Sequence, residues 1–173
     1  MKLGLAAIVG VISAAAATSA YSAGPVNANT TAAANIVAAS QLTATRSLDF
    51  GTIAKPFAGT STVTLAPTAS ATQTPTVTGS GFVPVPGQGR AAIFHMLGAN
   101  GQTYSVTQPA LSFTNQAGNL SNIVTSFATA SGSTTALPVN GQDDLFVGAS
   151  LDIDTNTVVQ AYTGTVAVTV TFN

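Results

Sequence analysis

The chain has 173 residues, which is enough for one domain with a sizeable core. Charged residues make up only 5% of it, where a typical soluble domain has about 25%. A formal net charge of −1 offers no electrostatic footprint for nucleic acid, so we expect no nucleic-acid partner. The chain has no cysteine, which excludes disulfides, thiol chemistry and cysteine-based zinc sites.

Threonine and valine are abundant, whereas glutamate is missing and lysine and arginine are scarce. Side chains that branch at Cβ lose rotamer freedom in helices and pack well on pleated strands. The composition alone therefore predicts an all-β protein.

The first 22 residues have the pattern of a secretory signal peptide. Lys2 supplies the positive charge, Leu3 to Ala17 is an apolar run, and small residues permit cleavage after Ala20 or Ser22. Because the uncharged stretch continues past this point, a retained membrane anchor is the alternative. No later apolar run is long enough to span a bilayer. We therefore expect an exported protein that passes through the periplasm to the cell surface.

Residues 23–38 are small, polar or alanine-rich and predict an extended arm before a β domain at 39–173. Small side chains alternate weakly along the arm, at Ala28, Thr30, Ala32, Ala34, Ile36 and Ala38. Such a row fits a neighbour's groove, where main-chain hydrogen bonds give affinity and alternate side chains give register. We expect the arm to lead into a first strand near Ile36 to Thr45. The other interpretation makes the arm itself the first strand of its own sandwich, after a short disordered tail.

The rest of the chain alternates short strands with turn residues. Residues 48–53 are expected to be a strand end with a kink at Gly51, and strands are expected at 60–65, 76–78, 91–97, 103–107, 121–129 and 145–153. Asn100-Gly101 is a strong signal for a hairpin between 91–97 and 103–107. About seven to nine short strands predict an immunoglobulin-like β-sandwich, complete or lacking a strand, with closure into a barrel as the alternative.

Two segments alternate most regularly. The first places Leu145, Val147, Ala149, Leu151 and Ile153 on one face. In the last strand, apolar residues at even positions alternate with mostly hydroxyl-bearing residues at odd positions, which predicts an inward and an outward row. A terminal strand of this kind can pair with a partner strand at a sheet edge. Its predicted assembly row is Val166, Val168, Val170 and Phe172.

The sequence offers little for catalysis. His95 is the only imidazole, it lies in an apolar strand, and no G-x-S-x-G elbow accompanies it. Phosphate-binding glycine loops and basic-aromatic stripes are also missing. We therefore expect a non-catalytic protein that needs no cofactor.

The acidic residues predict turns. Asp143-Asp144 follows Gly141-Gln142, which is typical of turn chemistry. Asp152, Asp154 and Asn156 resemble the opening of a calcium loop, but the expected glycine and glutamate do not follow. A hairpin turn with solvated carboxylates is the preferred interpretation, and a metal site at these three residues is the weaker one.

Three segments together resemble a known group of proteins. They are Leu48-Asp49-Phe50-Gly51-Thr52-Ile53, the stretch from Gly98 to Tyr104, and Tyr162-Thr163-Gly164-Thr165 with its alternating tail. Over roughly residues 36 to 173, the chain resembles an uncharacterised family of secreted proteobacterial β-domains. Members of that family look like chaperone–usher pilins and spore-coat-like fimbrial subunits.

The resemblance implies an incomplete immunoglobulin-like sandwich, completed first by a strand of a periplasmic chaperone and then by the arm of the next subunit. Residues Ala28 to Ala38 would match the donor arm, and Val166 to Phe172 the chaperone-recognition strand. The chain departs from pilins in lacking a disulfide and in having smaller residues in its arm.

Two functions follow as expectations. The first is a structural subunit of a pilus or fimbria, assembled by strand donation from identical or related subunits, with a chaperone and an outer-membrane usher as further partners. The alternative is a self-contained secreted sandwich that acts as a binding or adhesin module through its loops.

Overall fold

The computed structural model describes residues 30–34, 36, 39–81, 87–114 and 120–173. The chain divides into two compact units, Met1–Asn35 and Ile36–Asn173. In the first unit, the described residues 30–34 are exposed and belong to no helix or strand. The predicted signal peptide, residues 1–22, lies outside the described residues.

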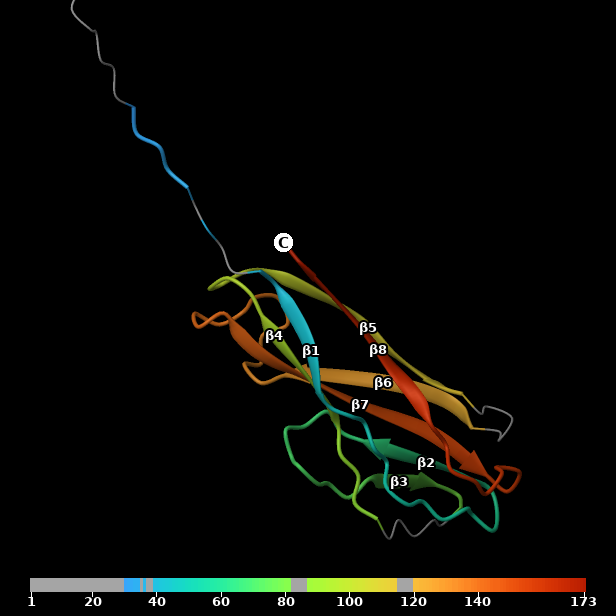
Figure 1. Cartoon of the computed structure of the whole chain (residues 1–173). Helices are drawn as coiled ribbons and strands as arrows, with labels where there is room; N and C mark the ends of the chain where they lie inside the picture. Colours follow the sequence, from blue (N-terminus) through green and yellow to red (C-terminus); the bar gives the residue numbers. More distant parts are fainter. Residues whose placement is uncertain (1–29, 35, 37–38, 82–86, 115–119) are drawn as a thin grey trace, which may run out of the picture. The chain divides into compact units, whose positions relative to one another are not determined.

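The second unit is built from antiparallel strands, and its described residues include no helix (Figure 1). The eight strands fall into two sheets, which confirms the predicted all-β sandwich. They are β1 (Gln41–Arg46), β2 (Thr60–Leu65), β3 (Thr76–Gly79), β4 (Ala92–Leu97), β5 (Tyr104–Phe113), β6 (Ser121–Thr129), β7 (Gln142–Asp154) and β8 (Gly164–Phe172).

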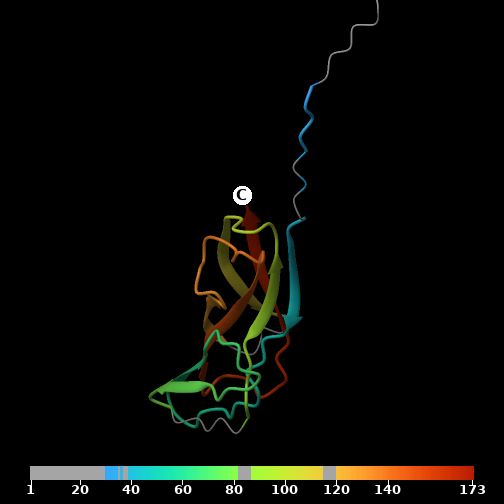
Figure 2. The ribbon, with the colours of Figure 1, turned by 90° about the vertical axis from the view of Figure 1, so that its left-hand side faces the viewer.

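The larger sheet is organised around β7. Along one edge β7 pairs with β6, and along the other it pairs first with β4 and then with β2. Outside these strands, β1 pairs with β4 and β3 pairs with β2, so β1 and β3 are edge strands. Figure 2 shows β1 as the outermost strand on its side. Gly148 lies between the stretch of β7 that pairs with β4 and the stretch that pairs with β2. A Cβ at Gly148 would collide with the carbonyl oxygen of Leu65.

The smaller sheet pairs β5 with β8 and contributes to the same core. The predicted inward row of β7 is buried throughout: Leu145, Val147, Ala149, Leu151 and Ile153. The inward row of β8 packs against the core but stays only partly buried, whereas Thr165, Thr169 and Thr171 are exposed. The alternation predicted for both strands is therefore present, and β8 covers the core less completely than β7.

The structure corrects the start of the domain. The first strand was expected near Ile36 to Thr45, but β1 begins only at Gln41. Ile36 is 93% exposed, because nothing in the described chain packs against it. The strand end expected at 48–53 consists of one bridge between Asp49 and Arg90, and the predicted kink is present, since Gly51 has a φ of 71°.

The predicted hairpin around Asn100-Gly101 is wrong. The turn itself forms, with the Gln102 N–H donating to the Ala99 carbonyl oxygen at 3.1 Å. However, β4 pairs with β1 and β7, while β5 pairs with β8 in the other sheet. The turn therefore crosses between sheets, because long-range pairing decides where each strand goes.

The interpretation of Asp143 and Asp144 as turn residues is also wrong, because both lie inside β7. The turn precedes them, and the Gly141 N–H donates to the Pro138 carbonyl oxygen at 2.9 Å.

Candidate functional site

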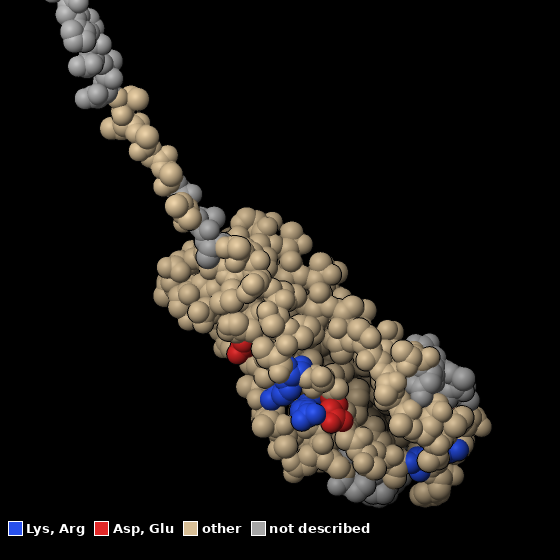
Figure 3. Space-filling model, viewed as in Figure 1, with Lys and Arg blue, Asp and Glu red and all other residues tan. Residues whose placement is uncertain are grey.

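An open groove of about 970 Å³ runs along the side of the sandwich where β1 and β8 form the free edges of the two sheets. Its first wall is the end of β1 with residues 47–55, and its second wall is residues 157–166. Figure 3 shows a hollow beside the charged side chains on this face. The floor belongs to the core: Ala92, Phe94, Leu111, Phe113, Leu120, Leu151 and Ile153. The groove therefore exposes part of the apolar interior.

The backbone of β8 presents a free hydrogen-bonding edge. The Thr163 carbonyl accepts from the Thr114 N–H at 2.8 Å, and the Asn173 N–H donates to the Thr103 carbonyl oxygen at 2.9 Å, so odd-numbered residues face β5. Because backbone groups alternate in direction along a strand, the even-numbered residues direct theirs to the opposite edge. These are the valines of the assembly row, and within the described strands β8 pairs with β5 alone.

A second free edge lies on β1. The Gly98 N–H donates to the Gly141 carbonyl oxygen at 2.9 Å, so even-numbered residues of β4 face β7 and odd-numbered ones face β1. Thr43 is the register partner of His95, so its backbone groups point to β4. The backbone groups of Ala44 then point away from the sheet, and its side chain lines the groove.

The first wall is held mainly by backbone contacts. Asp49 and Arg90 exchange two N–H to carbonyl bonds of 2.9 and 2.7 Å. Their side chains form an ion pair at 3.6 Å, and both are 49% exposed, so that pair contributes little. The neighbouring Leu48 and Phe50 pack against the two core clusters. The wall is therefore anchored on the segment that leads into β4.

The second wall begins at a capped turn. The Asp154 carboxylate accepts the N–H groups of Asn156 at 2.7 Å and Thr157 at 2.9 Å. These bonds, that from Asn156 foremost, lower the pKa of Asp154. Further along, the Tyr162 hydroxyl donates to the Val158 carbonyl oxygen at 2.7 Å. Residues 157–163 of this wall are irregular backbone that local bonds keep in shape, and residues 164–166 begin β8.

On the opposite side of the sandwich, side-chain hydrogen bonds bridge the two sheets beside a smaller hollow of about 380 Å³. The Gln108 side-chain amide donates to the Thr125 carbonyl oxygen at 2.6 Å and to its hydroxyl at 3.0 Å. The Thr125 hydroxyl in turn donates to the carbonyl oxygen of Pro109. These side-chain bonds join β5 to β6, and hence one sheet to the other.

The root of the arm is the segment that joins it to β1, at Ser40. The groove and this root lie at opposite ends of the domain. At the start of β1, the Ser40 hydroxyl donates to Gln102 at 3.1 Å, beside the loop that also holds the C-terminal Asn173. The groove is lined instead by the far end of β1 and the beginning of β8. Figure 1 shows the start of β1 at the same end as the C-terminus.

The predicted donor residues fall partly outside the described chain. Thr30, Ala32, Ala34 and Ile36 are exposed and belong to no strand. Ala28 and Ala38 lie outside the described residues. The side chains of the predicted assembly row, Val166, Val168, Val170 and Phe172, pack against the core. Val166 also lines the second wall of the groove.

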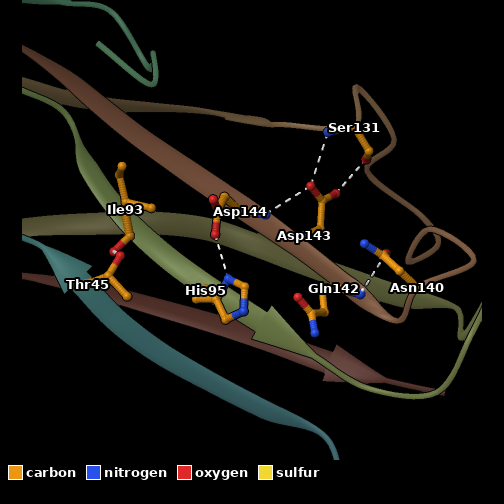
Figure 4. Close-up of polar contacts among 8 residues, drawn as sticks. All are labelled: Thr45, Ile93, His95, Ser131, Asn140, Gln142, Asp143 and Asp144. Carbon is orange, nitrogen blue, oxygen red and sulfur yellow. Dashed lines mark hydrogen bonds and ion pairs between the residues drawn. The ribbon is translucent and has the colours of Figure 1, made fainter. Parts of the chain in front are cut away.

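His95 lies on the outer face of the larger sheet, away from the groove. Its Nδ1 is 2.7 Å from Asp144 on the neighbouring strand β7 (Figure 4). Within the described part of the chain, no hydroxyl group hydrogen-bonds to the ring.

Asp143 is buried and accepts bonds from the Ser131 N–H at 3.1 Å and its hydroxyl at 2.5 Å. Nearby, burial raises the pKa of Tyr104, the negative charge of Asp143 raises it further, and a hydrogen bond with Thr129 opposes both. The Tyr104 hydroxyl donates to the Ser133 carbonyl oxygen at 2.7 Å. The pair therefore fixes the loop after β6.

The three residues considered as a calcium site take part in hydrogen bonds within the sheet and in the turn after β7. Asp152 accepts a bond from Thr62 on β2 at 2.5 Å, and Asp154 caps the turn containing Asn156. Among the residues that the structure describes, no three acidic or histidine side chains gather where they could hold a metal ion.

Sequence reasoning missed the residues that shape the groove walls. Arg46, Leu48, Phe50 and Tyr162 line it. The last three were noted for the resemblance, but no groove was predicted from them. Arg46 carried one usable signal, because it is one of only four basic residues.

Residues 40–172 match the family described as "Domain of unknown function (DUF4402)". The chain belongs to the DUF4402 family. No curated protein and no solved structure gave a significant match. The DUF4402 match covers all eight strands, both walls of the groove and the root of the arm. The described part of the chain contains no helix long and apolar enough to cross a membrane.

Proposed function

We propose that this DUF4402 protein is a non-catalytic structural subunit of a bacterial surface fibre, assembled by β-strand donation. The open groove supports the proposal, because it joins a free strand edge to an uncovered part of the core. A strand laid along β8 would hydrogen-bond to its even-numbered residues and cover the partly buried valine row. Arm residues 24–38 of a second copy are the proposed occupant.

The arm fits the groove in length and chemistry. Residues 23–38 are about sixteen residues that extend to about 50 Å, while the nine residues of β8 span about 30 Å. The arm carries no charge, so it enters an apolar groove without burying an unpaired ion. Ile36, which is 93% exposed, is its largest described apolar side chain.

The placement of root and groove supports a head-to-tail polymer. Since they lie at opposite ends of one domain, an arm that fills the next copy's groove stacks copies end to end. Such a heterologous contact leaves a free groove at one end and continues without closing. In the same proposal, the chain is exported, and a periplasmic chaperone and an outer-membrane usher guide its assembly.

Deletion of residues 24–38 tests the proposal. The shortened chain is expected to fold, because every described strand lies after Ser40, but to form no polymers under the electron microscope. Circular dichroism checks the fold. Adding a synthetic peptide of residues 24–40 should raise the unfolding temperature, because a ligand that binds only the folded state stabilises it. Filaments formed by the deleted chain would contradict strand donation.

A further inference from the structure

We infer that Arg46 is a positioning residue that keeps the first wall of the groove from closing across the partly buried side of its floor. This inference rests on the proposed function, since it concerns how the groove is kept ready for a donated strand. Arg46 is the last residue of β1 and lines the groove, and the irregular part of the first wall, residues 47–55, follows it directly. Its guanidinium group therefore acts at the point where the chain leaves the sheet.

The guanidinium group of Arg46 is shared among three carbonyl oxygens. Nε donates to Ala91 at 2.8 Å, at the entry to β4. The two terminal nitrogens donate to Ala69 at 3.1 Å and to Thr68 at 3.0 Å, in the connection between β2 and β3. One side chain thus joins the end of β1 to two segments far away in the chain.

The planar fork of arginine suits this role. It offers five N–H donors in fixed directions, whereas lysine offers a single ammonium group on a flexible stem. A β-bulge between Ala44 and Arg46 turns the strand here, so regular ladder pairing does not continue into the wall. Without the fork, the wall would be held only by the Asp49–Arg90 bridge and by the packing of Leu48 and Phe50 on the core.

The floor supplies the force that would close an unsupported wall. Leu111, Phe113 and Leu120 line the groove and are only partly buried. Leu48 and Phe50 already pack on the core at their own side of the groove. Covering apolar surface is favourable, so a released wall would move across the groove onto these three residues. Arg46 prevents this collapse and leaves the floor free for the donated strand.

The width of the groove tests the inference directly. The chain has no cysteine, so Ser47→Cys and Gln160→Cys place one spin label on each wall. The full-length chain also carries Ile36→Asp, which prevents donation and keeps it monomeric. Electron–electron resonance should give a shorter distance between the labels with Arg46→Lys than with Arg46. An unchanged distance would overturn the inference.

A mixing experiment separates a closed groove from a damaged fold. Arg46→Lys copies keep their arm, so they should add to a wild-type filament and then stop its growth. Adding them below the wild-type concentration should shorten filaments several-fold under the electron microscope. Thr107→Lys is the control, because it places the same ammonium group on the exposed outer face of β5. It should leave filament length unchanged.

The outcomes distinguish the two proposals. If Arg46→Lys copies join without shortening filaments, the role of Arg46 is wrong and strand donation stands. If the wild-type chain forms no filaments, strand donation itself is wrong. Should Arg46→Lys fail to fold, Arg46→Gln keeps a planar donor group, and the same shortening is expected. Binding of the 24–40 peptide to the folded variant should weaken by about tenfold, the cost of one charged hydrogen bond.

Discussion

The two long sides of the sandwich are finished in different ways. Between β5 and β6, Gln108 and Thr125 bridge the sheets through side-chain bonds, and Pro109 removes a backbone donor from the edge. Between β1 and β8 there is no such bridge in the described chain, and two free edges flank an apolar floor. Natural sheets usually protect their edges. Under the proposed function, the side without such a bridge is the one that receives the donated strand.

The largest expected difference concerns two valines. Val147 is completely buried, so Val147→Ala should lower the free energy of unfolding by about 2–3 kcal/mol, the methyl groups plus a cavity. Val168 lies in the partly buried row of β8, and Val168→Ala should cost about 1 kcal/mol in the monomer. Urea denaturation measures both. Equal losses would mean that β8 is covered as fully as the core.

The stability of the side between β5 and β6 should depend on Gln108. Gln108→Ala leaves the Thr125 carbonyl without its 2.6 Å donor, and we expect a loss of about 1–2 kcal/mol in unfolding free energy. Gln41→Ala, at an exposed glutamine on the open side, is the control and should change stability by less than about 0.5 kcal/mol. A loss as small as that of the control would remove the contrast between the two sides.

The smallest effect concerns acid and the second wall. Because the pKa of Asp154 is lowered in the fold, its stabilising contribution is present above the ordinary value of 3.8 and is lost as the pH falls through the folded pKa. The turn that Asp154 caps begins the second wall of the groove, so binding of the 24–40 peptide should weaken in acid. Asp154→Asn keeps an oxygen acceptor that does not titrate, and should flatten this decline. If binding of the peptide still weakened in acid with Asp154→Asn, another carboxylate would be the cause.

Much of the fold could be predicted where the pattern is local. The strand Thr60–Leu65 has the predicted bounds, and the alternation from Leu145 to Ile153 gave the buried face of β7. The pairing of β4 could not be predicted, because the Asn100-Gly101 turn forms in the same way whether or not its flanking strands pair.

The groove was harder to predict because its walls have no period. Residues 47–55 and 157–163 are irregular, and bonds between distant residues hold the first of them. The Arg46 fork joins residues 22 to 45 positions apart. A sequence read in short windows shows the arm and the last strand, but not the space between the edge strands.

The central place of β7 also sets the order in which the protein can fold. β7 comes late in the chain, yet β2, β4 and β6 all use it as a partner, in the case of Thr60 across 94 residues to Asp154. Until residues 142–154 are available, the larger sheet lacks its middle strand, and distant pairing of this kind makes folding slow. A chain that folds late in this way stays unfolded for longer during its synthesis. That delay would help a protein that must cross a membrane before it becomes compact.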